Sequence, residues 1–246
     1  MKRFFQIYRT EQKLFFRSAD VFIFNLCMPV AVLLLIGMIG EGKSAAGSSL
    51  TYLQSAFASL IAVGICCSAF MSIPIVIVDY RDKKILKHFY CSPCSPAWLL
   101  GADTLCSAVM AGISAILVSA TAALVFGYRM PGNPLLFVGA WLLTLVSMFS
   151  IGLMIASLCR TVKTMNAVTS LVYFPMLFLS GATVPYELFP KGLQAVANIM
   201  PLTQGIKLMK AVSMGMTFPV AKYVVILLLL ITIVCSTIAV KAFRWE

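Results

Sequence analysis

Long apolar stretches separated by short polar segments dominate the chain. Each stretch has roughly the 17 to 25 residues that cross a bilayer as a helix. The stretches cover residues 21–39, 53–78, 104–126, 134–158, 165–184 and 223–240. Within them, ionisable side chains other than those of cysteine and tyrosine lie only at the ends. We therefore predict an all-α integral membrane protein with six transmembrane helices, folded as a single domain over residues 1–246.

The composition supports a lipid environment for these stretches. The chain is 61% hydrophobic and 11% charged, and its mean hydropathy is +0.98, whereas an ordinary soluble domain is about 25% charged. Eight acidic and 19 basic residues cannot cover the surface of a soluble protein of 246 residues. The composition thus excludes a soluble enzyme.

The first 18 residues have a different pattern. On a helical wheel the apolar residues share one broad face, and they are Phe4, Phe5, Ile7, Tyr8, Leu14, Phe15 and Phe16. The basic residues gather on the other face, and they are Lys2, Arg3, Arg9, Lys13 and Arg17. This pattern predicts an amphipathic helix in the membrane interface, with its cations near anionic headgroups. Its role is either an anchor that sets topology or a lever that moves with the first membrane helix.

The basic residues also predict the orientation. Loops that stay in the cytoplasm retain Lys and Arg, and most of these residues fall on the inner side if the N-terminus is cytoplasmic. We therefore expect both termini inside. Lys43 then lies outside the cell, in the loop after the first membrane helix.

That position decides how a nucleotide-binding motif is interpreted. The sequence GMIGEGKS at residues 37–44 fits the phosphate-binding P-loop pattern, and IPIVIVD at residues 73–79 resembles the strand that accompanies it. A P-loop needs a strand before it and cytoplasmic ATP, and both are missing from this context. We predict an exofacial turn at residues 40–49 and the cytoplasmic end of the second membrane helix at residues 73–79, with no ATPase site on this chain.

The loop at residues 79–96 is the most charged part of the chain. Ile85, Leu86 and Phe89 form an apolar edge beside a charged set consisting of Arg81, Asp82, Lys83, Lys84 and Lys87. This pattern favours a short amphipathic helix that docks in a groove of a soluble partner. The alternative is a solvated loop whose charges only enforce topology.

The same loop contains a pair of cysteines, Cys91 and Cys94, three residues after His88. A structural zinc site needs four N or S ligands, and a redox pair needs a helix N-terminus to activate a thiol. No fourth ligand is apparent, and Pro93 and Pro96 interrupt a helix through the pair. We predict no metal and no cofactor bound by this chain.

Proline and glycine also interrupt the region before the last stretch. The breaks include Gly181, Pro185, Pro190 and Pro201 in an otherwise apolar sequence. Irregular backbone at membrane depth is tolerated only where protein buries it or where it lines a cavity. We predict two short re-entrant helices, residues 188–199 and 204–214, within an exofacial gate at residues 185–220; the alternative is an ordinary loop.

Asp103 lies at the boundary of the third stretch. An acid inside the membrane is a candidate functional residue, but an acid at a helix N-terminus is electrostatically favourable. We expect the second, purely structural role.

Two segments of the sequence resemble a known family. The inner loop places Arg81, Asp82, Leu86, Phe89, Pro93 and Ser95 on the pattern R-E-x-G-T-L-x-x-L-x-x-x-P-x-S, with Lys84 and Ile85 in place of its Gly-Thr. The segment FLSGATVPYELFPKGLQAVANIMPLTQGIKLMKAV carries Ser180-Gly181, Pro185, Pro190 and Pro201-Leu202-Thr203. With the six-helix plan, these features resemble the permease subunits of the ABC type-2 transporter family over the whole chain.

The resemblance implies an exporter permease in a bacterial cell membrane. Its ATP and Mg would be bound by a separate ABC ATP-binding subunit, which contacts the inner loop through a set comprising Arg81, Asp82, Lys83, Lys84, Ile85, Leu86, Phe89 and Pro93. A second permease subunit, identical or homologous, would complete a path at the dimer interface. We expect this path to be lined by Phe57, Met71, Phe174, Phe178 and Ser180.

An aromatic and methionine-containing lining suits an amphiphilic substrate, such as a drug, an antimicrobial peptide or a lipid-like molecule, and so predicts a role in multidrug or antibiotic resistance. Two alternatives stay open: a non-transporting immunity or sensor protein on the same plan, and an exporter of polysaccharide or lipid-linked polymer. We expect the lipid bilayer as a partner and no nucleic acid.

Overall fold

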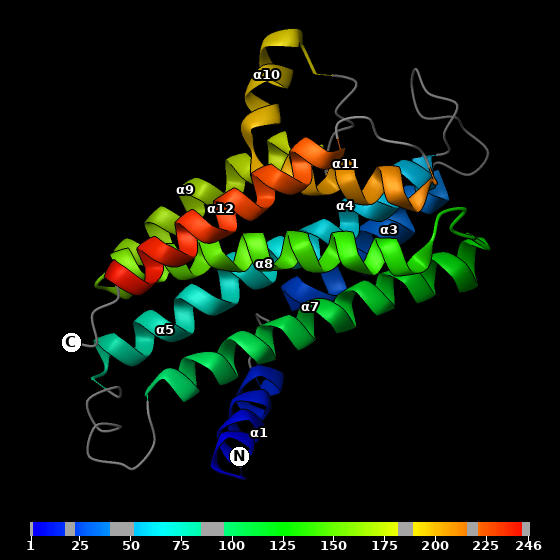
Figure 1. Ribbon diagram of the computed structural model, residues 1–246. Helices are drawn as coiled ribbons and strands as arrows, with labels where there is room; N and C mark the ends of the chain where they lie inside the picture. The colour runs from blue at the N-terminus through cyan, green and yellow to red at the C-terminus, as the bar shows by residue number, and fades with distance from the viewer. Residues whose placement is uncertain are drawn as a thin grey trace.

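The computed structural model describes residues 2–17, 23–39, 52–84, 96–181, 189–215 and 221–242. All regular elements in these ranges are helices, which confirms the all-α prediction (Figure 1). In chain order they are α1 (Lys2–Arg17), η1 (Ile23–Cys27), α3 (Met28–Ile39), α4 (Tyr52–Cys67), η2 (Ser68–Ser72), α5 (Ile73–Asp82), α7 (Pro96–Phe126), α8 (Pro134–Leu158), α9 (Val162–Leu179), α10 (Lys191–Ile199), α11 (Pro201–Ser213) and α12 (Ala221–Ala242). The segments η1 and η2 are single π-helical turns; η1 leads directly into α3, and η2 lies between α4 and α5.

Five helices in the described ranges are long and apolar enough to cross a membrane, which fits an integral membrane protein. They are Ala56–Asp82, Trp98–Phe126, Pro134–Leu158, Val162–Leu179 and Ala221–Ala242. The first of these runs without interruption through α4, η2 and α5, so residues 73–79 are helical, as the sequence predicts. A shorter apolar helix, Asn25–Met38, lies in the first predicted stretch. The count of six spans stays a prediction.

Helix α8 lies at the centre of the bundle. α12 packs along it, and α11, α5 and η2 also contact it. Small residues allow this close approach: a Cβ added at Gly152 would lie 2.2 Å from the carbonyl oxygen of Ala69 in η2. At Gly205 of α11, an added Cβ would lie 2.5 Å from the Thr144 side chain of α8. These contacts fix how deeply α11 and η2 sit against the central helix.

The ends of the central helices follow from local sequence. Asn133 caps α8 by accepting a hydrogen bond from the backbone N–H of Leu135 at 2.9 Å, and Pro134 occupies the first turn, where its missing N–H costs nothing. Thr161 caps α9 in the same way through the N–H of Thr164. The chain therefore turns between α8 and α9 within three residues of the end of α8.

Two helices project from the bundle. α1 packs against α7 and extends away from the bundle with the N-terminus at its tip, and α10 rises on the opposite side next to α9 and α11 (Figure 1). The helices α10 and α11 confirm that residues 185–220 contain two short helices, although they begin at Lys191 and Pro201 and not at residues 188 and 204. A placement of α1 in the membrane interface stays a prediction.

Candidate functional site

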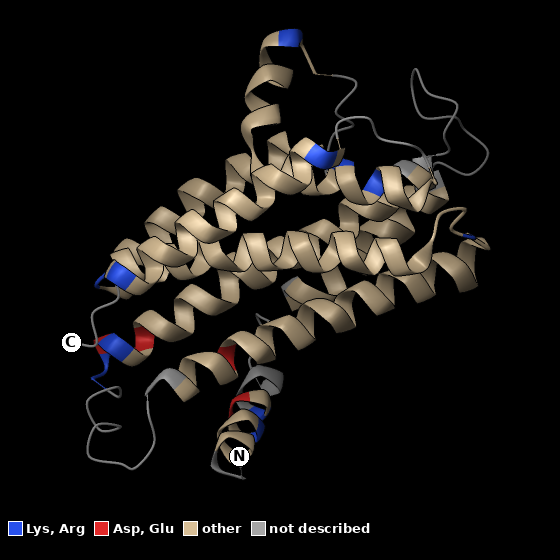
Figure 2. Ribbon diagram, in the orientation of Figure 1, with Lys and Arg blue, Asp and Glu red and all other residues tan. Residues whose placement is uncertain are grey.

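Acidic residues of the described ranges all lie at one end of the bundle, where α1, α5 and the start of α7 meet (Figure 2). They are Glu11, Asp79, Asp82 and Asp103. We call this region the inner junction and define it by Glu11, Tyr80, Arg81 and Asp103. It includes the last turn of α5, which leads into the loop expected to dock on a partner.

The last turn of α5 exposes part of the predicted docking set. Asp82, Lys83 and Lys84 are exposed, and Lys83 pairs with Asp79 one turn earlier at 2.8 Å. Lys84 has a positive φ of 56°, a backbone conformation that ends a helix. Ile85, Leu86, Phe89 and Pro93 lie outside the described residues, so the predicted coupling helix is not tested.

Arg81 faces the bundle. Its side chain is 9% exposed, and Nη1 donates to the carbonyl oxygens of Ala156 at 3.3 Å and Cys159 at 2.9 Å. These carbonyls belong to the last turn of α8 and the residue that follows it, where the helix leaves its acceptors unsatisfied and its dipole is negative. Arg81 is among the residues expected to contact an ATPase subunit, and that contact stays a prediction; within this chain its side chain joins α5 to the end of α8.

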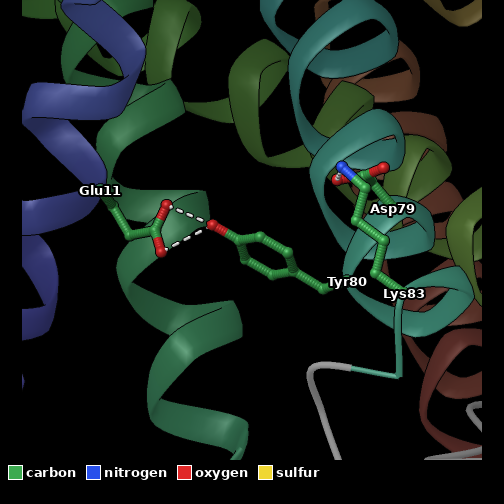
Figure 3. A network of polar contacts seen from close by, with 4 residues as sticks. All are labelled: Glu11, Asp79, Tyr80 and Lys83. Atoms are coloured by element: carbon green, nitrogen blue, oxygen red, sulfur yellow. Dashed lines mark hydrogen bonds and ion pairs between the residues drawn. The ribbon is translucent and has the colours of Figure 1, made fainter.

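A second contact fastens α5 to α1. The Tyr80 hydroxyl lies 2.9 Å from both carboxylate oxygens of Glu11 (Figure 3). Glu11 is 5% exposed although it lies on an amphipathic surface helix. Burial raises the pKa of the Glu11 carboxyl, and the hydrogen bond from Tyr80 partly opposes this effect. The last turn of α5 is thus hydrogen-bonded to α1 on one side and to the end of α8 on the other.

Asp103 completes the inner junction. The expectation that it stands at a helix N-terminus is wrong, because α7 begins at Pro96, seven residues or about two turns earlier. The influence of the helix dipole falls off within the first turn. Asp103 is 1% exposed, and its two oxygens have no hydrogen-bond partner in the part of the chain that the structure describes.

A buried polar cluster in the bundle was not anticipated from the sequence. Ser68 donates to Oδ1 of Asn25 at 3.0 Å, and Nδ2 of Asn25 lies 3.4 Å from the Ser72 hydroxyl. Asn25 lies in η1, and the two serines lie in η2. Such π-helical turns often occur at functional sites. Asn25, the polar residue within the first apolar stretch, was the available signal.

Residues expected along a path are divided between the core and the surface. Phe57 is 4% exposed and packs against Tyr128 and Phe137, and Ser180 is also buried. Phe174 and Phe178 of α9 stack on each other and are about half exposed, and Met71 is half-buried. Phe57 therefore lies inside this chain, which differs from a lining role at a dimer interface; Phe174 and Phe178 are on a surface that could have that role.

The residues of the expected gate are partly described. Gly181 has a φ of +80°, in the region that favours glycine, directly after α9 ends. Pro190 is the N-cap of α10 and Pro201 begins α11. Lys207 of α11 donates to Asn198 of α10, a side-chain contact between the two helices. Pro185 lies outside the described residues.

The described ranges contain no group of three or more His, Cys, Asp or Glu residues that could hold a metal ion. His88, Cys91 and Cys94 lie outside these ranges, as does most of the P-loop-like motif at residues 37–44. The part of that motif which is described, and the residues before it, form the helix α3 and not the strand that a P-loop needs.

Comparison with known proteins gives a consistent assignment. The sequence model of the ABC-2 type transporter family matches residues 2–214. The chain is 26% identical over 143 residues to the proteins named inner membrane transport permease YhhJ of Escherichia coli (strain K12) and Shigella flexneri. These matches cover 55% of this chain and 37% of each relative, so the chain spans well under half the length of these curated relatives. Because the family match covers most of the chain, and because the fold is an all-helical membrane bundle, this protein belongs to the ABC-2 type transporter family.

Proposed function

We propose that this chain is the permease subunit of an ATP-driven exporter, working with a separate ABC ATPase and a second permease subunit. The carrying observation is the inner junction. The second span, Ala56–Asp82, ends in exposed charges, and Tyr80 and Arg81 connect that end to α1 and α8. A pull on the end of α5 would reach two other helices through these contacts.

The second span can carry such a displacement because it is one continuous helix. The second span is continuous from residue 56 to residue 82, and most of its middle is buried, so a displacement of its end would be carried along its length. Its middle passes through η2, where a π-helical turn loosens the regular hydrogen bonding. ATP-driven approach of two ATPase subunits would bend or shift this span and open a path outward.

The exposed surface of α9 favours an amphiphilic substrate. Phe174 and Phe178 are 49% and 56% exposed, and their two stacked rings form a short aromatic strip on α9. Such a strip offers apolar contact to a drug, a peptide or a lipid-like molecule. We also propose that the protein lies in a bacterial cell membrane with both termini in the cytoplasm.

The test is ATP hydrolysis by the reconstituted chain with and without a candidate ABC ATPase, for example one encoded by an adjacent gene. We expect no hydrolysis by the chain alone and a stable complex whose hydrolysis responds to added amphiphile. Asp82→Arg with Lys84→Glu reverses two exposed charges and should weaken the complex. Lys191→Glu is the control, because Lys191 is an exposed charge at the start of α10, the helix that projects from the opposite side of the bundle to α1 (Figure 1). Hydrolysis by the isolated chain would refute the proposal. A complex whose ATP hydrolysis does not change with any added amphiphile would favour a sensor protein.

A further inference from the structure

The helices α3 and α5 begin with the same pair of features. In each, a single π-helical turn is followed two residues later by a buried proline: η1 ends at Cys27 and precedes Pro29, and η2 ends at Ser72 and precedes Pro74. Proline lacks the N–H that bonds one turn back, and its ring crowds the carbonyl there, so it kinks a helix. A π-helical turn is a second recognised cause of a kink. Each of these helices therefore has a hinge at its π-helical turn.

A buried side chain connects the two hinges. The Ser68 hydroxyl donates to Oδ1 of Asn25 at 3.0 Å, and Nδ2 of Asn25 donates to the Ser72 hydroxyl at 3.4 Å. All three side chains are at most 1% exposed. Ser68 and Ser72 are the first and last residues of η2, whereas Asn25 lies in η1. The amide group of η1 thus bonds to both ends of the turn in the other helix.

This arrangement makes separate bending of the two hinges unfavourable. A change in the twist of η2 turns Ser68 and Ser72 relative to each other, so a stationary amide loses at least one of them. The groups left behind are buried, and a buried polar group without a hydrogen bond is costly. If η1 moves together with η2, both hydrogen bonds are kept. Asparagine also hydrogen-bonds across membrane helices for stability alone, but here both bonding partners lie in a hinge.

We propose that Asn25 is a positioning residue that couples the two hinges, so that η1 and η2 bend together and a displacement of the last turn of α5 also moves α3. The coupling itself does not depend on the proposed function. Its use in transport does rest on that function, so each is tested by its own experiment.

The coupling is tested in the full chain alone, in nanodiscs. Pulsed electron paramagnetic resonance measures the distance between spin labels carried on non-canonical amino acids in place of Met38 and Leu135, which are exposed near the end of α3 and the start of α8. Pro74→Ala supplies an N–H beside η2 and so changes the bend there. Met38 lies nine residues beyond Pro29. Over that length, about 14 Å of helix, a change of about 10° at η1 moves the label by roughly 2 Å.

We expect Pro74→Ala to shift the mean label distance by about this amount, because the bend at η2 is passed to η1. Asn25→Leu should abolish the shift. Ser68→Ala with Ser72→Ala removes the same hydrogen bonds from the other side and serves if Asn25→Leu does not fold. Ser150→Ala is the control, because the hydroxyl of this buried serine bonds within its own helix. An equal shift without the amide, or no shift in the chain that retains it, overturns the coupling.

The role in transport is tested in the complex with the ABC ATPase, with a fluorescent amphiphile as the probe. Asn25→Leu should lower the amount transported per ATP hydrolysed at least about fivefold, the lower end of coupling between sites. Ser68→Ala with Ser72→Ala should do the same, and all three changes together should lower it no further. Transport per ATP by Asn25→Leu equal to that of the wild type refutes the role in transport. Absence of transport by the wild-type complex refutes the proposed function, and the spin-label experiment still decides whether the hinges are coupled.

Discussion

Truncation of Arg81 tests whether the end of α5 is fastened to the central helix. The Arg81→Ala change removes the donor that serves the carbonyls of Ala156 and Cys159. A hydrogen bond from a charged group contributes about 1.5 to 3 kcal/mol, and a cation at a helix C-terminus about 0.3 to 1 kcal/mol more. Relief of the cost of burying the guanidinium offsets part of this sum. We expect a net loss of about 3 kcal/mol.

That loss corresponds to a decrease in Tm of roughly 6 to 12 °C for a chain of this size. The assay is thermal unfolding of the purified chain without any partner. Arg81→Lys keeps a charge but lacks the forked donor geometry, so its Tm should lie between those of Arg81→Ala and the wild type. Lys83→Ala is the control, because an exposed pair within one helix contributes about 0.3 to 0.5 kcal/mol.

The contrary result is equally specific. If Arg81→Ala unfolds at the wild-type temperature and yet fails to bind an ABC ATPase, then the guanidinium faces the partner in the working protein. The hydrogen bonds to α8 would then not describe the state that matters for coupling.

Three further predictions concern packing, buried polarity and pH. Gly152→Leu should abolish monodisperse elution in size-exclusion chromatography, because a Cβ there meets the Ala69 carbonyl at 2.2 Å, whereas Gly139→Leu, with open space around it, should elute normally. Asn25→Leu leaves two serine hydroxyls of η2 without their amide partner and should lower the free energy of unfolding by about 1 to 3 kcal/mol in denaturant titrations. Burial raises the pKa of Glu11 above its ordinary 4.5, so the docked α1 binds a proton more tightly than the undocked helix does. Its docking should therefore weaken as the pH rises from about 4.5 through the raised value, and limited proteolysis of α1 should show this dependence in the wild type and lose it in Glu11→Gln.

The helices could be predicted because lipid-facing surface leaves a long apolar signal in the sequence. The apolar pattern predicts the wrong first residue for a helix where a charged residue interrupts the pattern. The third apolar stretch begins after Asp103, but α7 begins at Pro96, because a proline is well tolerated in the first turn and a helix can continue through a charged residue. The sequence pattern shows where polar residues occur, whereas caps and packing determine where a helix begins.

The roles of the polar residues could be predicted less well, because they depend on contacts between distant segments. Arg81 and Asp82 are adjacent and similarly polar, yet one is buried against α8 and the other is exposed. The partner of Tyr80 lies 69 residues away in α1. Neither contact follows from local spacing. Among residues 81–84 of the docking set, only the structure distinguishes the buried member from the exposed ones.

The proposed function requires that this chain form a path which a separate ATPase drives. It is tested most directly by ATP-dependent accumulation of a fluorescent amphiphile in inside-out vesicles that contain the chain and its candidate ABC ATPase. We expect accumulation that requires ATP, both proteins and an intact ATPase site. Equal accumulation with an ATPase that cannot hydrolyse ATP, or with the chain alone, would contradict it.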